Sequence, residues 1–269
     1  MPAGIRIPQT DEVIMDYSIE YTCLCDKGNT RKENQDNFFC AGKYLNAHNN
    51  GLEKPLTGLC TATQSPVFSV FDGISGEQCG ETAAYIAAVT LDECLDRRKK
   101  TNTIGFLVFA CKEINSKICD FVRKNNIFRM GTTAAMVMFK ETSSIICNLG
   151  DSRVYRFNGN SLTQLSKDHV AIDYSYGGKP LLTQNLGIPK EEFVIEPYIA
   201  EGALQSGDIF LICSDGLTNM VSEADIQSIL AQSGTTLDGA KKLLSAALHN
   251  GGKDNITIIL CKTCFQPYN

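Results

Sequence analysis

The chain has 269 residues, of which 43% are hydrophobic and 20% charged, the composition of an ordinary folded protein rather than a disordered or fibrous one. Its net charge of −5 and its pI near 5.3 argue against a general binder of nucleic acids or anionic membranes. No apolar run approaches the roughly 20 residues that a membrane-spanning helix needs, so no membrane insertion is expected.

The predicted elements alternate between strands and helices. In chain order we expect strands over 16–25 and 66–73, helices over 77–98 and 104–125, glycine-punctuated strands over 131–139, 144–158 and 161–166, a strand over 208–216, helices over 222–234 and 236–249, and a last strand over 255–263. Ser222 is a plausible N-cap of its helix. No repeat or linker divides the chain, so we expect one α+β domain of antiparallel sheets covered by helices.

The 12 cysteines are scattered through these elements, which favours reduced and mostly buried thiols over a disulfide framework. The first 18 residues, MPAGIRIPQTDEVIMDYS, lack the basic and then apolar layout of a signal peptide, so a cytoplasmic location is the default expectation. One cysteine pattern permits a second interpretation. If the two terminal strands pair, Cys23, Cys25, Cys261 and Cys264 could meet as a structural zinc site, although this spacing is a weak signal.

Acidic residues recur where the predicted strands stop. Asp72, Asp151 and Asp215 each adjoin a glycine at a strand end, and Asp36 and Asp254 lie beside other apolar strands. A single Asp-Gly pair is usually only a turn. Five carboxylates with few basic residues nearby would repel one another and raise each other's pKa unless a cation lies between them. All-oxygen ligands suit hard divalent ions such as Mg²⁺ or Mn²⁺.

Other catalytic patterns are missing from the sequence. The chain has no HExxH, GxSxG or P-loop motif. Its three histidines, His48, His169 and His249, are scattered, and His48 and His249 are expected to be solvated. Two ions about 3.5–4 Å apart can activate a water and clamp a phosphoryl oxygen without any side-chain nucleophile.

The order of the motifs makes the comparison with known families specific. The chain resembles the metal-dependent protein phosphatase (PPM) family, the type 2C serine/threonine phosphatases, and in particular its compact bacterial members. The matching segments span about residues 17–262 and leave 1–16 as an N-terminal extension of a single domain over 1–269. They are RKENQDN, FDGISGEQCGE, MGTTA, NLGDSRVYRF, LSKDH, TQNLG, LICSDGLTNMVSEADI and GGKDNITIIL.

The resemblance implies an α-β-β-α sandwich, with two antiparallel sheets flanked by helix pairs and a binuclear Mn²⁺ or Mg²⁺ centre at one end. It implies that Asp72 bridges both ions, that the Gly73 carbonyl binds one of them, and that Asp215 and Asp254 complete a shell. It further implies that Asp36 contacts a metal-bound water and that Asp151 shares a third, weaker ion with Asp215. It implies that Arg31 contacts the substrate phosphate and that Asn255 supports the site without binding metal itself. Asp168 and His169 look structural.

Three departures from the family pattern bear on this transfer. Gln35 stands where eukaryotic members have Glu, so a neutral contact or a water replaces one ligand, and Glu33 could compensate only in an unusual loop. Ile74 stands where those members have a histidine and cannot donate a proton, while Ser75 replaces a glycine and needs a backbone without strongly positive φ. The segment over 168–187 is short, which predicts a trimmed flap and a more open cleft.

The resemblance predicts hydrolysis of phosphoserine and phosphothreonine in proteins, through in-line attack by a water shared between the ions. The implied partners are phosphorylated proteins that are substrates of a membrane-anchored bacterial serine/threonine kinase; the oligomeric state is open. A non-catalytic phosphoprotein-binding module is one alternative, but such members usually lose metal aspartates that are retained here. A regulatory phosphatase of a partner-switching pathway is another, and the lack of a fused sensor domain weakens it.

Overall fold

The computed structural model describes residues 17–61, 64–74, 79–98, 103–176 and 179–265. Its strands are β1 (Tyr17–Asp26), β2 (Asp36–Cys40), β3 (Leu56–Thr61), β4 (Val67–Asp72), β5 (Ala134–Lys140), β6 (Ser143–Leu149), β7 (Arg153–Phe157), β8 (Leu162–Gln164), β9 (Val170–Tyr176), β10 (Lys179–Leu182), β11 (Tyr198–Ala203), β12 (Ile209–Cys213) and β13 (Ile256–Phe265). Its helices are α1 (Gly80–Asp96), α2 (Thr103–Asn125), α3 (Asp215–Thr218), α4 (Glu223–Ala231) and α5 (Thr236–His249).

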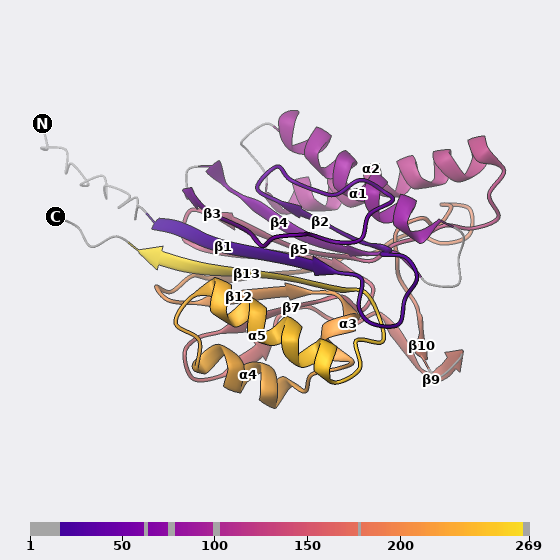
Figure 1. Cartoon of the computed structure of the whole chain (residues 1–269). Helices are drawn as coiled ribbons and strands as arrows, with labels where there is room; N and C mark the ends of the chain where they lie inside the picture. Colours follow the sequence, from indigo (N-terminus) through magenta and orange to yellow (C-terminus); the bar gives the residue numbers. More distant parts are fainter. Residues whose placement is uncertain (1–16, 62–63, 75–78, 99–102, 177–178, 266–269) are drawn as a thin grey trace, which may run out of the picture.

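The strands form two large antiparallel sheets and a separate ribbon. The first sheet has six strands in the order β3-β1-β13-β12-β7-β8, and the second has five in the order β11-β6-β5-β4-β2. Strands β9 and β10 pair only with each other and project from the lower right in Figure 1. The first sheet includes both the first and the last strand of the chain, since β1 pairs with β13 along its whole length.

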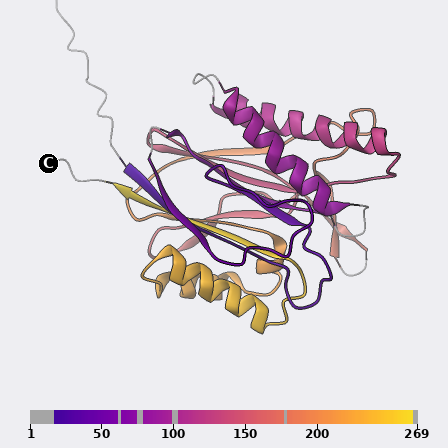
Figure 2. The same ribbon diagram turned by 45° about the horizontal axis from the view of Figure 1, so that its top comes forward.

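The two sheets lie face to face, and each carries helices on its outer side (Figures 1 and 2). Helices α1 and α2 cover the second sheet through one apolar cluster, and α3, α4 and α5 cover the first sheet through another. A third cluster, which includes Phe68, Phe139 and Phe210, fills the space between the sheets. The α-β-β-α sandwich that the resemblance implied is therefore confirmed.

Burial explains why these segments take these forms. Strand β5 is apolar along nearly its whole length because it is covered on one face by helices and on the other by the opposite sheet. In α1, Ala83, Ala84 and Ala87 are fully buried, and their small side chains let the helix approach the sheet closely. Ser222 caps α4 as predicted, because its side chain accepts a hydrogen bond from the backbone N–H of Asp225.

Several boundaries differ from the sequence prediction. The helix predicted over 77–98 begins at Gly80, directly after Cys79, whose φ of 56° lies in the left-handed region. Strands β2, β3, β9, β10 and β11 and the short helix α3 were not predicted, and the segment predicted over 144–158 contains two strands, β6 and β7, joined by a turn. The missed strands are short, and β3 and β11 lie at sheet edges where side chains are only partly buried, so their sequences lack a strong apolar pattern.

The zinc hypothesis for the four cysteines is wrong, although the terminal strands do pair. Cys23 and Cys25 lie opposite Ile259 and Thr257, and Cys261 lies opposite Tyr21, so these three share one face of the sheet. Cys264 lies opposite Ser18, one residue out of step, and therefore on the other face. No cluster of three or more metal-binding cysteines is present in the described part of the chain. No helix in the described ranges is long and apolar enough to span a membrane.

Candidate metal centre

The register of the second sheet places two of the predicted aspartates side by side. Asp36, the first residue of β2, lies directly opposite Asp72, the last residue of β4. Two residues further into each strand, Phe38 and Val70 belong to the cluster between the sheets, so both carboxylates face the same inter-sheet space. Like charges directly opposite each other in a sheet are unfavourable, which indicates that this pair has a purpose other than stability.

The first sheet brings Asp215 and Asp254 to the same end. Asp215 follows β12 and begins the short helix α3, and Asp254 precedes β13, the neighbour of β12. The two segments approach closely at Gly216, where a Cβ would lie 1.9 Å from the carbonyl oxygen of Asn255. The glycine in this Asp-Gly pair is thus required by backbone packing and not only by a turn.

A similar approach fixes the segment after Asp72. A Cβ on Gly73 would lie 2.4 Å from the carbonyl oxygen of Gly80 at the start of α1. The Gly73 N–H donates to the carbonyl of Gln35, and Thr132 Oγ1 donates to the carbonyl of Asp72 at 2.9 Å. The strand end that carries Asp72 is therefore held on three sides by backbone and hydroxyl contacts.

The carboxylate of Asp36 is buried, with one oxygen satisfied and the other not. Its Oδ2 accepts hydrogen bonds from Ser214 Oγ and Thr257 Oγ1, each at 2.7 Å. Its Oδ1 is buried and has no hydrogen-bond partner among the described residues. Burial raises the pKa of Asp36 to about 7; the two hydroxyls oppose the rise, and repulsion by Asp254 and Asp215 adds to it. A buried carboxylate oxygen without a donor is costly unless something else binds there.

Asp72 lies within the field of all the other candidate carboxylates. Burial raises its pKa well above the usual range, and the negative charges of Asp36, Asp215, Asp151 and Asp254 raise it further. The structure thus brings together all five aspartates that the sequence singled out. Asp151 reaches this group from the turn between β6 and β7.

Arg31 reaches the same end of the molecule, where it pairs with a carboxylate. Its Nη2 donates to Asp254 Oδ2 at 2.7 Å, and this contact raises the pKa of Arg31 although burial opposes the charged form. The side chain remains one-third exposed, at 33%. Asn255 holds the loop that carries Arg31, because its Oδ1 accepts from the Gln35 N–H and its Nδ2 donates to the carbonyls of Lys27 and Glu33. Asn255 therefore has the supporting position expected of it.

Sequence reasoning missed the hydroxyls that support the carboxylates. Ser214 and Thr257 fix Asp36 from the opposite sheet, and Thr133 Oγ1 accepts the backbone N–H of Asp72 at 3.1 Å. Ser152 in turn bonds Thr133 at 2.7 Å. Each is far in sequence from the aspartate it supports, and serine or threonine in a strand gives no signal of such a contact. Ser214 was the one such residue that its position could have indicated, because it directly precedes Asp215 in the SDG segment.

The three departures have different outcomes. Gln35 Nε2 donates to Glu81 Oε2 at 3.4 Å, so Gln35 contacts α1, and Glu33 is exposed rather than a substitute ligand. Ile74 is partly buried, its N–H donates to the carbonyl of Gly131, and its hydrocarbon side chain offers no proton. Ser75 lies outside the described residues, as do residues 1–16. The short flap segment includes the β9–β10 ribbon, and its effect on the cleft stays a prediction.

Asp168 and His169 have structural contacts, in agreement with the sequence interpretation. Both carboxylate oxygens of Asp168 accept from Arg153, and Gln164 also donates to it. His169 Nδ1 accepts the backbone N–H of Gly150 at 3.2 Å, and burial lowers the pKa of His169. His169 thereby orients the turn that carries Asp151.

The donor set fits hard divalent cations. It consists of carboxylate and backbone oxygens, which such ions prefer. Two of its aspartates, Asp36 and Asp72, have raised pKa values, and Asp36 Oδ1 is buried without a hydrogen-bond donor among the described residues. Among the described residues, no three His, Cys, Asp or Glu side chains converge on a single point.

Comparison with known proteins gives concordant matches. A family model described as Protein phosphatase 2C matches residues 56–250. Serine/threonine phosphatase stp of Listeria welshimeri is 28% identical over 253 residues, which cover 87% of this chain and 92% of that protein. Protein phosphatase PhpP of Streptococcus pneumoniae is 28% identical over 258 residues, covering 90% and 96%. The crystal structure of the catalytic domain of serine threonine protein phosphatase PstP in complex with two manganese ions superposes with a TM-score of 0.75 at 24% identity, covering 92% and 99%.

Proposed function

The chain belongs to the protein phosphatase 2C family, and from that premise we propose that it is a metal-dependent protein phosphatase that hydrolyses phosphoserine and phosphothreonine in proteins. The observation that carries this proposal is the set of five aspartates around Asp72, whose mutual repulsion calls for cations. Similar relatives are named serine/threonine phosphatases, which favours catalysis over a non-catalytic binding module.

The centre takes two Mn²⁺ or Mg²⁺ ions. In the proposed arrangement Asp72 and the Gly73 carbonyl would hold the ions together with Asp215 and Asp254, and Asp36 would lie beside them. Asp151 and Asp215 would hold a third ion if one binds. When bound, the ions supply positive charge to the phosphoryl oxygens and lower the pKa of a water. The chain's own part is to hold the carboxylates in place through hydroxyls such as Ser214 and Thr257.

Arg31 is proposed to bind the substrate phosphate. In the structure it neutralises Asp254, and a cation at Asp254 would take over that task and release the guanidinium. A planar guanidinium can hold two phosphate oxygens at once, and its partial exposure leaves it accessible to a protein substrate. Ile74 provides no proton, so the leaving alkoxide does not obtain one from a side chain at that position.

At the level of the whole chain, we propose one phosphatase domain over 1–269, because the two sheets share a single apolar cluster. We also propose that it is cytoplasmic and acts on substrates of a bacterial serine/threonine kinase. The kinase partner follows from the likeness to bacterial serine/threonine phosphatases, including one from Mycobacterium tuberculosis.

Turnover of p-nitrophenyl phosphate and of a phosphothreonine peptide tests the proposal. We expect hydrolysis of both with Mn²⁺, none in EDTA, and a large loss in Asp215→Asn. The matched control is Asp96→Asn, an exposed aspartate at the far end of α1, which should retain wild-type activity. Peptide binding without hydrolysis would instead establish a binding module, and equal rates with Mn²⁺ and in EDTA would overturn the mechanism.

A further inference from the structure

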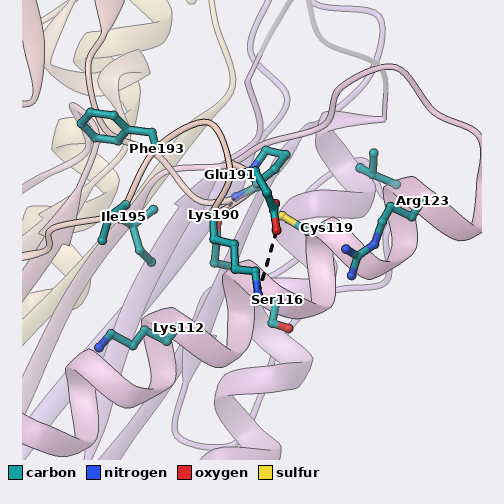
Figure 3. Close-up of a pocket in the computed structure, with 13 residues that line it drawn as sticks. Lys112, Ser116, Cys119, Arg123, Lys190, Glu191, Phe193 and Ile195 are labelled. Carbon is teal, nitrogen blue, oxygen red and sulfur yellow. Dashed lines mark hydrogen bonds and ion pairs between the residues drawn. The ribbon is translucent and has the colours of Figure 1, made fainter.

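A groove of about 430 Å³ lies between the C-terminal half of α2 and the segment 187–195, outside the inter-sheet space that holds the aspartates. Figure 3 shows Ser116 and Cys119 on the helix side, and Ile195 and Lys190 on the other side. We call this feature the α2 groove. Its volume falls within the range of small-molecule sites, about 300–1,000 Å³.

The lining of the α2 groove combines apolar surface with positive charge. Its apolar part includes Val122, Pro189, Phe193, Val194 and Ile195. Phe193 and Val194 are adjacent and remain 48% and 64% exposed, so they leave apolar surface open at the groove.

Three basic residues line the groove, against a single acidic one. Lys112 lies at one end and Arg123 at the other, with Lys190 between them beside its neighbour Glu191 (Figure 3). Arg123 is paired with Asp120, and Lys190 approaches Glu191 at 3.9 Å. Lys112 has no ion-pair partner among the described residues. A net positive groove on a chain of net charge −5 is complementary to an anion that carries an apolar body.

The floor of the groove is tied to the catalytic end by hydrogen bonds. Asn115 Oδ1 accepts the N–H groups of Gly187 and Ile188, and its Nδ2 donates to the carbonyl of Ile188. The preceding residue, Leu186, exchanges two backbone hydrogen bonds with Thr132, at 2.9 and 3.1 Å. Thr132 Oγ1 then donates to the carbonyl of Asp72. A ligand that shifts segment 187–188 therefore acts on a short bonded path to Asp72.

We propose that the α2 groove is a regulatory site for a small amphiphilic anion, an acid with an aryl or alkyl body, whose binding is coupled to the end of β4. The apolar wall would bury the body, and Lys112 and Lys190 would attract the anionic group. Binding of the anion to the α2 groove goes beyond the proposed phosphatase activity and does not depend on it. Only the interpretation of the coupling as regulation rests on that activity.

The binding test uses 8-anilinonaphthalene-1-sulfonate, a fluorescent aryl sulfonate, as the probe. The full chain is titrated in EDTA, so that the aspartate centre repels the anion instead of attracting it through bound metal. We expect saturable binding to one site. Ser116→Trp should abolish it by filling the groove from an exposed position on α2, and Lys112→Ala with Lys190→Ala should weaken it about tenfold.

Matched controls come from Lys117, which is exposed on the same helix but does not line the groove. Lys117→Trp and Lys117→Ala should bind the probe within twofold of wild type. Because the chain has no native tryptophan, folding of each variant is checked by an unchanged far-UV circular dichroism spectrum and a cooperative thermal transition. Unaltered binding in Ser116→Trp, or no saturable binding in wild type, would overturn the site. Unaltered binding in the lysine pair alone would overturn its preference for anions, and competition by decanoate or benzoate distinguishes alkyl from aryl bodies.

Thiol labelling locates the probe. Cys119 lines the groove and is partly buried, whereas Cys264, also partly buried, lies on β13 in the other sheet. Iodoacetamide labelling followed by mass spectrometry should show slower modification of Cys119 in the presence of the probe and an unchanged rate at Cys264. Equal protection of both cysteines, or of neither, would contradict binding in the α2 groove.

Hydrogen exchange tests the coupling without metal or turnover. The N–H of Thr132 donates to Leu186, and that of Thr133 to the carbonyl of Asp72, so peptides covering 131–134 report on the path. Saturating probe should slow their exchange at least threefold and leave peptides from α5 unchanged. Unchanged exchange over 131–134 with the groove occupied would overturn the coupling, and that result is independent of whether the chain is an active phosphatase.

Discussion

Two groups of carboxylates lie at strand ends of this molecule, and they are neutralised differently. Around Asp168, Arg153 donates to both oxygens, Gln164 donates to one of them, and Arg153 also bonds Tyr155. Around Asp72, burial and four further aspartates raise its pKa, and Arg31 pairs with one of these aspartates, Asp254. The first group is complete within the protein. In the second, mutual repulsion raises the pKa of Asp72, which is the property that distinguishes a site for cations from a structural ion pair.

The largest expected effect is on catalysis. Asp215→Asn keeps the shape of the side chain and its contact partner Asn219 but removes one negative charge. We expect kcat/KM for p-nitrophenyl phosphate with Mn²⁺ to fall by at least about 100-fold, because a carboxylate that binds metal cannot be replaced by an amide at equal strength. Asp168→Asn should change the rate of folded protein by no more than about threefold. Equal losses in the two variants would erase the distinction between the groups.

The next effect is on the free energy of unfolding, which should fall when a carboxylate is removed from the Asp168 group and rise when one is removed from the Asp72 group. Asp168→Asn removes the nearer ion-pair partner of Arg153 and leaves Glu223, at 3.7 Å; the side chains of Arg153 and Asp168 are only 28% and 19% exposed. We expect urea unfolding to show a loss of about 2 kcal/mol, less than the 3–5 kcal/mol of a fully buried pair. Asp72→Asn relieves repulsion, so the metal-free protein should be more stable than wild type. A destabilised metal-free Asp72→Asn would contradict the repulsion inferred here.

The pH dependence of the metal-free protein is the third effect. The pKa of Asp36 is raised to about 7 in the folded chain, whereas an unfolded aspartate titrates near 4. Between these values the folded state binds more protons than the unfolded state, so stability falls as pH rises from about 4 to 7. Melting in EDTA should therefore occur about 5 °C lower at pH 7 than at pH 5 from this contribution. Asp36→Asn should reduce that difference, and an unchanged profile would refute the assignment.

The smallest effect concerns the hydroxyls behind Asp36. Ser214→Ala combined with Thr257→Val removes two hydrogen bonds to Asp36 Oδ2 without removing a carboxylate. We expect Mn²⁺ affinity, measured by calorimetry, to fall about tenfold, as when other supports of metal ligands are lost. Thr263→Val is the control, since that hydroxyl lies further along β13 and bonds Gln205. A similar loss in the control would attribute the effect to general destabilisation.

The sequence predicted the carboxylates of the site better than their surroundings. Asp72, Asp151 and Asp215 could be found because each lies at, or within two residues of, the end of a strongly apolar strand, a pattern that can be recognised without knowledge of the fold. Ser214 and Thr257 could not, because their contact with Asp36 depends on how the two sheets face each other. The ion pair between Arg31 and Asp254 likewise joins residues 223 positions apart, so only the folded chain reveals it.

The same limit applies to the fold. Long amphipathic helices such as α2 and α5 were predicted nearly to their ends, since their periodicity is local. The edge strand β11 has half-exposed residues and escaped detection, because what defines it is pairing with β6. The failure of the cysteine hypothesis has a related cause, since that hypothesis was conditional on pairing of the terminal strands, and the register of β1 with β13, which separates Cys264 from the others, is not visible in the sequence.

The most direct test of the central claim is a count of bound metal. Equilibrium dialysis against Mn²⁺ at pH 7.5, followed by elemental analysis, should find at least two ions per wild-type chain. Asp72→Asn should lose tight binding of both, because Asp72 lies at the centre of the carboxylate group, while Asp168→Asn should bind as wild type does. A wild-type chain that binds no Mn²⁺, or an Asp72→Asn chain that binds as much as wild type, would contradict the account.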